Sequence, residues 1–313
     1  MRVLVAGGAG LIGRAMCARL LERGDEVICV DNLSTGSIEH VKEFHANEFY
    51  RFIEADISRF NAASVTGALD RVINLACPAS PADFEPLSLE ILEVGSRGLM
   101  NLLDLCVSTG ARFLQASTSE VYGDPAVHPQ PESYWGNVNP IGPRSVYDEA
   151  KRFGEATTMA YKRRYGMEVR IARIFNTYGP GMRHDDGRVV SNFVAQALRD
   201  EPLTVYGDGS QTRSLCFVDD EVGGLIALLE SDLDTPVNIG NDDERSILEI
   251  ASLVVELCGS RSGISYLPMP ADDPAQRRPD LALARSRLGW EPTTPLREGL
   301  ARTVEWFRST TPQ

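Results

Sequence analysis

A tyrosine and a lysine stand four residues apart in the stretch GPRSVYDEAKR, residues 142–152. On a helix, residues i and i+4 lie on one face about one turn apart, so Tyr147 and Lys151 are expected to point the same way. A tyrosine, whose reference pKa is about 10, is a poor base at neutral pH unless a nearby positive charge stabilises its phenolate. The pair therefore suits a base that accepts the proton of an alcohol, with the lysine ammonium beside it, although the spacing alone fits an exposed helix face with an incidental pair equally well.

Three glycines near the start of the chain, Gly7, Gly10 and Gly13, stand between a short apolar run and a helical pattern. Glycines at such a turn let backbone N–H groups approach a pyrophosphate at the positive end of the helix. Asp31 follows Gly13 by 18 residues and ends the next apolar run, where it would accept hydrogen bonds from ribose hydroxyls and repel a 2′-phosphate. A plain glycine turn is the alternative, but strand, helix and acid together favour a dinucleotide, and NAD over NADP.

The positive nicotinamide ring of bound NAD would help Lys151 to stabilise the Tyr147 phenolate, so the two motifs together predict alcohol oxidation. Asp56 and Ile57 end another strand pattern and could border the adenine, although a purely structural aspartate fits almost as well. The residues expected to contact the cofactor are Gly7, Gly10, Leu11, Ile12, Gly13, Asp31, Asn32, Asp56, Ile57, Tyr147 and Lys151.

Apolar strand patterns alternate with helical patterns in the first half of the chain. Strands are expected at residues 1–6, 26–31, 51–56, 71–76, 112–118 and 168–176, and helices at 11–23, about 87–108 and from Tyr147 to about Tyr165. This alternation predicts an α/β fold, a Rossmann-type doubly wound parallel sheet covered on both faces. The rhythm changes after residue 176. We expect a NAD-binding domain at 1–178 plus about 212–243, and a smaller nucleotide-sugar-binding lobe at about 179–211 and 244–313.

The composition is that of an ordinary globular protein of 313 residues, 43% hydrophobic and 24% charged. A net charge of −13 argues against nonspecific binding to nucleic acid or an anionic membrane, and means that an anionic ligand needs a local cluster of arginines. Six cysteines without a CxxC pair and four histidines without ligand spacing predict reduced thiols and no metal site. No apolar run reaches about 18 residues, so we expect a cytoplasmic protein.

These motifs together resemble those of the extended short-chain dehydrogenase/reductase superfamily of nucleotide-sugar enzymes. The similarity covers essentially the whole chain and includes GGAGLIG at 7–13, STSEVYG at 117–123 and FNTYGP at 175–180. CPASP at 77–81, GNVNPIGPRSVYDEAKR at 136–152 and DGRVVSNF at 186–193 more specifically resemble the UDP-glucuronate decarboxylases, also called UDP-xylose synthases. The resemblance implies a carboxy-lyase that uses bound NAD to convert UDP-glucuronate to UDP-xylose, with no net redox change.

The resemblance also implies the course of the reaction. Oxidation of the sugar C4 to a ketone makes the C5 carboxylate part of a β-keto acid, whose loss of CO₂ leaves an enolate. Protonation at C5 and return of hydride to C4 then give UDP-xylose. Thr118 would hydrogen-bond the C4 oxygen and Ser119 the carboxylate. Glu120 would do acid–base or water-positioning work near C5, and a purely structural role for it stays open.

Arginines are expected to bind the anionic substrate. The resemblance places Arg213 near C5 and the diphosphate, where it would hold the carboxylate or stabilise the enolate, with a surface ion pair as the alternative. Arg277 in QRRPD aligns best with a diphosphate-binding arginine, although Gln276 replaces the first arginine of the family pattern. The expected catalytic residues are Tyr147, Lys151, Thr118, Ser119, Glu120 and Arg213, and the expected substrate-binding residues are Pro81, Glu120, Asn176, Arg188, Asn192, Tyr206, Arg213 and Arg277.

Two other interpretations stay open. A UDP-uronate or UDP-hexose 4-epimerase of the same superfamily would share Tyr147, Lys151 and NAD, whereas a noncatalytic NAD-binding regulator would need only the glycines. The family often carries tyrosine where Phe84 stands, which leaves fine substrate preference open. The resemblance also implies a homodimer formed by the helix at about 87–108 and the helix of Tyr147, although internal packing explains their apolar residues equally well.

Overall fold

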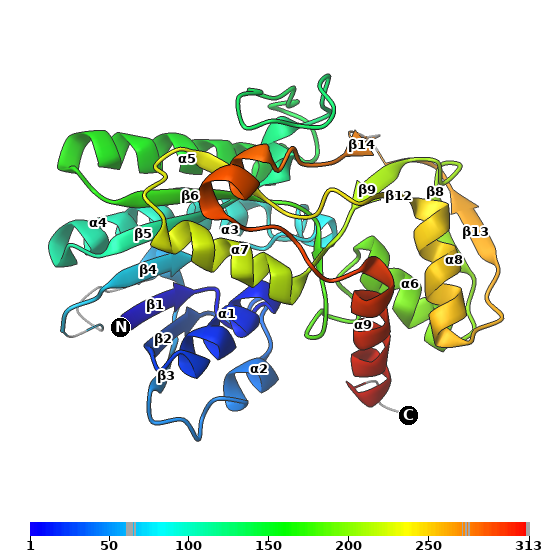
Figure 1. The fold of residues 1–313 in the computed structure, drawn as a ribbon, viewed down its shortest axis with the longest axis horizontal. Helices are drawn as coiled ribbons and strands as arrows, with labels where there is room; N and C mark the ends of the chain where they lie inside the picture. Colours follow the sequence, from blue (N-terminus) through cyan, green and yellow to red (C-terminus); the bar gives the residue numbers. More distant parts are fainter. Residues whose placement is uncertain (61–64, 66, 271, 273, 275, 311–313) are drawn as a thin grey trace.

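The structure is a computed structural model, and it describes residues 1–60, 65, 67–270, 272, 274 and 276–310. Within these residues, seven parallel strands form one sheet in the order β11-β6-β5-β4-β1-β2-β3 (Figure 1). The strands are β1 (Arg2–Ala6), β2 (Glu26–Asp31), β3 (Tyr50–Glu54), β4 (Arg71–Asn74), β5 (Arg112–Thr118), β6 (Val169–Ile174) and β11 (Pro236–Ile239). The order reverses between β1 and β4, and sheets of this kind bind ligands beyond the carboxyl ends of the strands at that point.

Helices cover both faces of the sheet, as the alternating sequence pattern predicts. The α-helices of the described residues are α1 (Leu11–Glu22), α2 (Ile38–Lys42), α3 (Ser88–Glu93), α4 (Leu99–Thr109), α5 (Ser145–Tyr165), α6 (Val189–Leu198), α7 (Val218–Glu230), α8 (Ile247–Cys258) and α9 (Leu296–Thr310). Val3 and Val5 of β1 pack on the side of α1 and α7, while Leu4 and Ala6 pack on the side of α4. The strand is apolar throughout because both of its faces are buried.

The single helix expected at about 87–108 is interrupted in the structure. α3 ends at Glu93, a π-helical turn occupies Val94–Gly98, and α4 follows. A Cβ on Gly95 would lie 2.8 Å from Ala150 of α5, and a Cβ on Gly98 would lie 2.8 Å from Ile57. The two glycines allow a close approach to α5 and to the turn after β3. Hydrophobic periodicity does not reveal such a local change of helical pitch.

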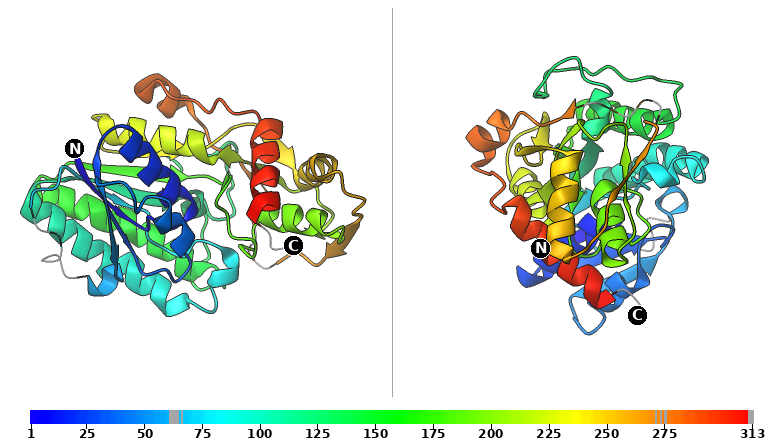
Figure 2. Two further views of the ribbon diagram at one scale, coloured as in Figure 1. Left: turned by 90° about the horizontal axis from the view of Figure 1, so that it is seen from below. Right: turned by 90° about the vertical axis from the view of Figure 1, so that its right-hand side faces the viewer.

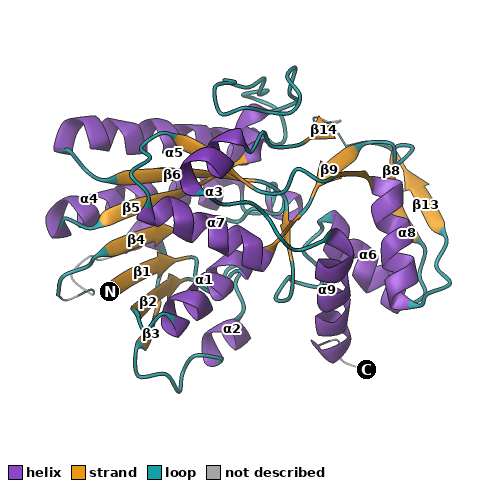
Figure 3. Ribbon diagram, in the orientation of Figure 1, coloured by secondary structure: helices purple, strands orange, loops and turns teal. Residues whose placement is uncertain are grey.

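A separate hydrophobic cluster fills the C-terminal part of the chain, on the right of Figure 1, where α6, α8 and α9 pack together. The parallel pair β8 (Leu203–Tyr206) and β13 (Ile264–Leu267) flanks it. Figure 2 shows this part beside the large sheet from two other directions, and Figure 3 shows it coloured by secondary structure. Near the end of the chain, Ala284 and Trp290 return to pack against the α1–α7 side of the sheet. The exact division into two domains stays a prediction.

Shorter strands complete the structure between the large sheet and α8. They are β7 (Thr177–Tyr178), β9 (Thr212–Ser214), β10 (Cys216–Phe217), β12 (Glu244–Ser246) and β14 (Gln276–Arg277). β9 pairs with β12 on one side and with β14 on the other, which brings Arg213 and Arg277 into register. In the described part of the chain, no helix is long and apolar enough to span a bilayer.

Candidate active site

A cavity of about 560 Å³ lies beyond the carboxyl ends of the sheet strands and reaches the C-terminal cluster. Most of the predicted site residues line it: Gly7, Gly10, Leu11, Ile12, Gly13, Pro81, Thr118, Ser119, Glu120, Tyr147, Lys151, Asn176, Arg188, Asn192, Tyr206, Arg213 and Arg277. Counted over the described residues, six lysine and arginine side chains and three carboxylates line the cavity. This part of an acidic protein therefore favours an anionic ligand.

The other four predicted residues, Asp31, Asn32, Asp56 and Ile57, lie outside this lining and gather at the ends of β2 and β3. Asp31 Oδ2 accepts a hydrogen bond from the Ala9 N–H at 3.0 Å, which joins this group to the glycine loop. Asn32 Nδ2 donates to Asp56 Oδ2 at 3.3 Å, whereas the Ile57 side chain is buried in the core. Burial raises the pKa of Asp31, although two backbone N–H groups oppose the rise.

Close backbone packing in the loop between β1 and α1 depends on its glycines. A Cβ on Gly13 would lie 2.0 Å from Gly7 O, and Gly7 has a φ of +80°, which glycine adopts without strain. Among the described residues no side chain caps α1, so the N–H groups of its first turn are available to an anion. These features fit the pyrophosphate of NAD, with Asp31 placed at the end of the neighbouring strand.

Tyr147 lies in the first turn of α5 and is 6% exposed. Its ring stacks on the ring of Phe84, with the centroids 5.0 Å apart and the planes 17° apart. Lys151 lies one turn further along α5, with Nζ 5.6 Å from the centroid of the tyrosine ring. The same Nζ donates a hydrogen bond to Ala116 O at 2.9 Å, which fixes the ammonium beside the end of β5. The predicted pair therefore shares one face of one helix.

Protein groups alone do not make Tyr147 a base. Burial raises the pKa of Tyr147, and the neighbouring Cys77 and Glu120 add to the rise. A hydrogen bond with Thr118 and the charge of Arg188 act in the opposite direction. Abstraction of a proton near pH 7 therefore depends on additional positive charge at the phenol, which the nicotinamide ring supplies when NAD is bound.

β5 ends at Thr118, and a short 3-10 turn, Ser119–Tyr122, begins there. Thr118 Oγ1 accepts a hydrogen bond from the Glu120 N–H at 3.3 Å, which caps this turn. Ser119 Oγ accepts a hydrogen bond from Arg277 Nη1 at 3.0 Å. Because the serine oxygen accepts from the arginine, its own O–H is available to donate to a ligand in the cavity.

Glu120 is held between two arginines. Its Oε2 accepts from Arg144 Nη2 at 2.9 Å and from Arg277 Nη2 at 3.1 Å. Burial would raise the pKa of Glu120, but the charges of Arg277, Arg144 and Arg213 outweigh it and lower the pKa to about 2. Glu120 is therefore a carboxylate at neutral pH. Of the two chemical roles expected for Glu120, the ionised form suits the positioning of water better than the supply of a proton, and its two arginine contacts also fit the structural role that the sequence left open.

Arg277 is 1% exposed, and both of its terminal nitrogens hold the turn after Thr118. Besides Ser119 and Glu120, it donates to Gly123 O at 2.9 Å through Nη2. Its Nε has no hydrogen-bond partner among the described residues. Diphosphate binding by Arg277 stays a prediction, whereas the contacts make it a support of the neighbouring site residues. Arg213 lies beside it in β9, is 9% exposed and also lines the cavity.

Three further residues of the cavity, Phe84, Arg144 and Arg183, were not assigned to the site from the sequence. Arg144 stands three residues before Tyr147, so its position at the start of the same helix was a usable signal. Phe84 was noted only as a departure from the family pattern. Arg183 pairs with Asp83 at 3.2 Å, a contact between segments 100 residues apart that no local pattern shows.

The model of the NAD dependent epimerase/dehydratase family matches residues 3–240. The chain belongs to that family. It is 50% identical over 309 residues to the Arabidopsis thaliana protein named UDP-glucuronic acid decarboxylase 1, a match that covers 99% of this chain and 70% of that protein. The predicted superfamily is thus confirmed, and NAD is the cofactor of the family.

Two solved structures share the fold at full length. One is the UDP-glucose 4-epimerase with UDP-glucose from Thermotoga maritima, with a TM-score of 0.90 and 31% identity over 99% of both chains. The other is the UDP-glucuronic acid 4-epimerase from Bacillus cereus in complex with UDP-glucuronic acid and NAD, with a TM-score of 0.88 and 28% identity over 99% of this chain and 100% of that one. The predicted Rossmann-type fold is confirmed.

Proposed function

We propose that this chain is a UDP-glucuronate decarboxylase that releases CO₂ and forms UDP-xylose without net change of its NAD. The observation that carries the proposal is the group formed by Ser119, Glu120 and Arg277, which lines the same cavity as Tyr147. A serine O–H and neighbouring guanidinium groups suit a substrate carboxylate, whereas the ionised Glu120 is unsuited to protonate a leaving hydroxyl. Relatives at about 50% identity, named UDP-glucuronic acid decarboxylases, support the same reaction.

The glycine loop would hold the pyrophosphate of NAD, and Asp31 with Asn32 would receive the adenosine ribose. When bound, NAD would supply the acceptor and later the donor of the C4 hydride. Tyr147 accepts the proton of the C4 hydroxyl, while Thr118, its hydrogen-bond partner, holds the C4 oxygen. Lys151 keeps its ammonium at the tyrosine ring. The product of this step is a β-keto acid.

Loss of CO₂ from the β-keto acid sends an electron pair towards the new C4 carbonyl, which becomes an enolate. Ser119 donates its O–H to the carboxylate before this step, and the positive charge of Arg213 stabilises the developing enolate. Glu120 orients a water that delivers the proton to C5. The other predicted substrate contacts are those of Pro81, Asn176, Arg188, Asn192, Tyr206 and Arg277, all of which line the cavity.

The deciding experiment is incubation of the NAD-loaded protein with UDP-glucuronate, followed by measurement of the mass of the nucleotide sugar and of released CO₂. The expected product has lost the mass of CO₂ and is identified as UDP-xylose. A product of unchanged mass with a new sugar configuration would make the chain a 4-epimerase instead. Absence of any turnover, with NAD binding intact, would favour the noncatalytic NAD-binding regulator.

The homodimer expected from the family resemblance belongs to the same proposal. Leu89 and Leu92 of α3 are 71% and 40% exposed, and Phe153 of α5 is 47% exposed. α3 and α5 pack against each other, so these apolar side chains belong to neighbouring helices. Sedimentation velocity of wild type and of Leu89→Glu tests the proposal. A monomeric wild-type protein would exclude it.

The cytoplasmic location expected from the sequence stays a prediction.

A further inference from the structure

The segment 80–84 lies in the loop after β4, and its last residue, Phe84, contacts Tyr147. Ser80 caps a short 3-10 turn, Pro81–Asp83, by accepting a hydrogen bond from the Ala82 N–H at 3.2 Å. Phe84 ends this segment, is 4% exposed, and stacks on Tyr147. The guanidinium carbon of Arg144 lies 5.6 Å from the centroid of the same Phe84 ring. Arg144 also donates a hydrogen bond to Glu120. Phe84 therefore contacts both Tyr147, the proposed base, and Arg144, which binds the Glu120 carboxylate.

At its other end, the segment 80–84 is attached to the loop 181–188, which precedes α6. Arg183 Nη2 lies 3.2 Å from Asp83 Oδ1, and Ser80 Oγ donates a hydrogen bond to Asp186 O. We call these two contacts the clasp. Gly187, at a φ of +82°, lets the loop approach, because a Cβ there would lie 3.0 Å from the Ala82 side chain. The clasp thus joins the loop after β4 to the loop before α6 at the cavity.

The loop 181–188 is anchored on the opposite side to the C-terminal cluster. The His184 ring lies 4.5 Å from that of Phe307 and 5.7 Å from that of Trp306, both on α9. Met182 is buried in the same cluster as α6 and α9. The loop 181–188 therefore connects the C-terminal cluster to the clasp, and through the clasp to the segment that carries Phe84.

We propose that Phe84 is a positioning residue for Tyr147, and that the clasp holds Phe84 against the tyrosine ring, so that the two loops joined by the clasp align the base. An offset stack of two rings restricts the tilt of the phenol about its side-chain torsions, which decides where its oxygen points. The base and the C4 hydroxyl must meet within hydrogen-bond reach, so a small tilt has a large kinetic effect. The proposal rests on the C4 oxidation step of the proposed function and is independent of the decarboxylation that follows.

The test measures the first hydride transfer directly, as the rise in ultraviolet absorbance of reduced nicotinamide when NAD-loaded protein is mixed with UDP-glucuronate in a stopped-flow instrument. For Phe84→Leu we expect this rate to fall about tenfold to a hundredfold, since misplacement of about 1 Å costs on that order. KM for UDP-glucuronate and affinity for NAD should change less than about threefold, because Phe84 acts on the base and not on the ligands. Phe84→Tyr keeps the ring and should restore the rate to within about twofold of wild type.

A second readout separates positioning from general structural damage. Burial raises the pKa of Tyr147, and the Phe84 ring contributes to that burial. In Phe84→Leu water reaches the phenol more easily, so the rise of the hydride-transfer rate with pH should move to lower pH. A Phe84→Leu variant with the wild-type rate and pH profile would overturn the proposal. So would a loss of rate matched by an equal loss of NAD affinity.

The clasp is tested by Asp83→Asn, Arg183→Gln and the double variant. Each single variant should lower the hydride-transfer rate about threefold to tenfold, and the double variant should resemble the single ones because both remove one shared contact. Additive losses would reject the clasp. If Phe84→Leu fails to fold, Asp83→Asn carries the test, since it keeps the shape of a partly exposed side chain. Wild-type hydride transfer without release of CO₂ would reject the proposed function and leave this proposal standing.

Discussion

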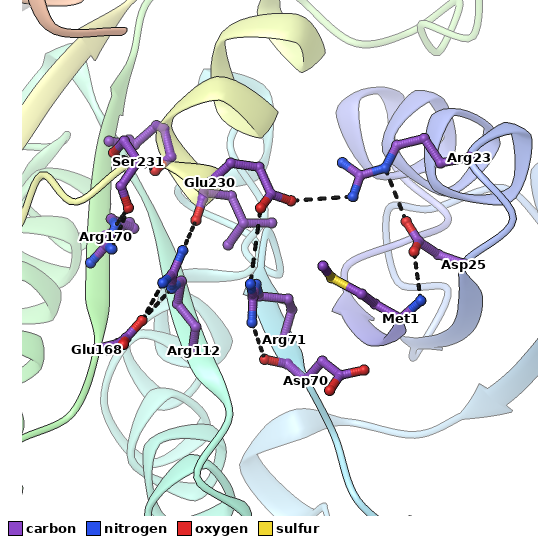
Figure 4. Close-up of polar contacts among 12 residues, drawn as sticks. Met1, Arg23, Asp25, Asp70, Arg71, Arg112, Glu168, Arg170, Glu230 and Ser231 are labelled. Carbon is purple, nitrogen blue, oxygen red and sulfur yellow. Dashed lines mark hydrogen bonds and ion pairs between the residues drawn. The ribbon is translucent and has the colours of Figure 1, made fainter.

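The two ends of the large sheet carry similar charged side chains and use them differently. At the amino ends of the strands, shown in Figure 4, the chain terminus of Met1 and the side chain of Arg23 both pair with Asp25, at 2.8 and 3.2 Å. Arg23 and Arg71 also reach Glu230, at 3.2 and 3.9 Å. Cations and carboxylates there satisfy one another, as in an ordinary structural ion-pair network.

At the carboxyl ends, the arginines are buried more deeply than Arg23 and Arg71, and cations outnumber carboxylates. Glu120 receives hydrogen bonds from Arg144 and Arg277, and Arg213 lies next to them. The cavity that contains them has more cations than carboxylates among its described lining residues. An excess of buried positive charge is costly without an anion, so this end of the sheet is arranged for a ligand. Both ends of the sheet use the same residue types. The cavity end differs in its surplus of cations over carboxylates and in the burial of its arginines, and these two features indicate its function.

The largest effect is expected for Tyr147→Phe, which removes one oxygen from the cavity end. Without the phenol no group accepts the C4 proton, so formation of UDP-xylose should fall by about a thousandfold or more. NAD affinity, measured by titration calorimetry, should stay within about twofold because the glycine loop is unchanged. Turnover near the wild-type value would reject Tyr147 as the base.

Arg277→Met should lower both stability and activity. The variant removes the buried donor of Ser119 Oγ and Gly123 O and one of the two arginine donors of Glu120, and removal of one partner of a buried ion pair costs about 3 kcal/mol or more. Urea denaturation checks the loss of unfolding free energy, and CO₂ release checks the chemistry. The pKa of Glu120 should rise at the same time, because Arg277 is the largest of the charges that lower it. An unchanged unfolding free energy would mean that Arg277 does not support the turn.

The sequence predicted what local pattern controls, namely the β1–α1 glycine turn, the alternation of strands and helices, and the helix that presents Tyr147 and Lys151. It did not predict the partners of Arg277, which lies 157 residues from Glu120 along the chain. Nor did it predict the Arg183–Asp83 pair or the π-helical turn at Val94–Gly98. These features depend on how distant segments pack, and a single sequence carries no periodicity for such contacts.

Two buried aspartates, Asp25 at the amino ends of the strands and Asp148 beside Tyr147, differ in whether cations neutralise them. Asp25 has the Met1 ammonium and Arg23 as partners, so Asp25→Asn should destabilise the protein by about 2 kcal/mol. Asp148, next to Tyr147 and 5% exposed, has an Oδ1 without a hydrogen-bond partner among the described residues. Burial and the charge of Glu120 raise the pKa of Asp148 to about 7.

The sign of the pH effect at Asp148 follows from this raised pKa. The folded protein holds a proton that the unfolded chain loses above its reference value of 3.8, so stability falls as the pH rises from about 4 to about 7. Asp148→Asn removes that loss and should stabilise the protein above pH 7 by on the order of 2 kcal/mol, with little effect near pH 4. Thermal unfolding at several pH values checks this, and an equal shift at every pH would contradict it.

The smallest effect is expected at the amino end, for Arg112→Ala. The Arg112 side chain is 17% exposed and pairs with Glu168, which is 62% exposed, so water competes for the pair. Its Nη1 also donates to Leu229 O at 2.9 Å. The unfolding free energy should fall by about 1 kcal/mol or less, and by less still at high salt. UDP-xylose formation should stay within about twofold, because surface pairs of this kind rarely act at a distance. A tenfold loss of turnover with unchanged stability would show that the two ends of the sheet are coupled, and that the surplus of charge at the cavity end does not by itself define the site.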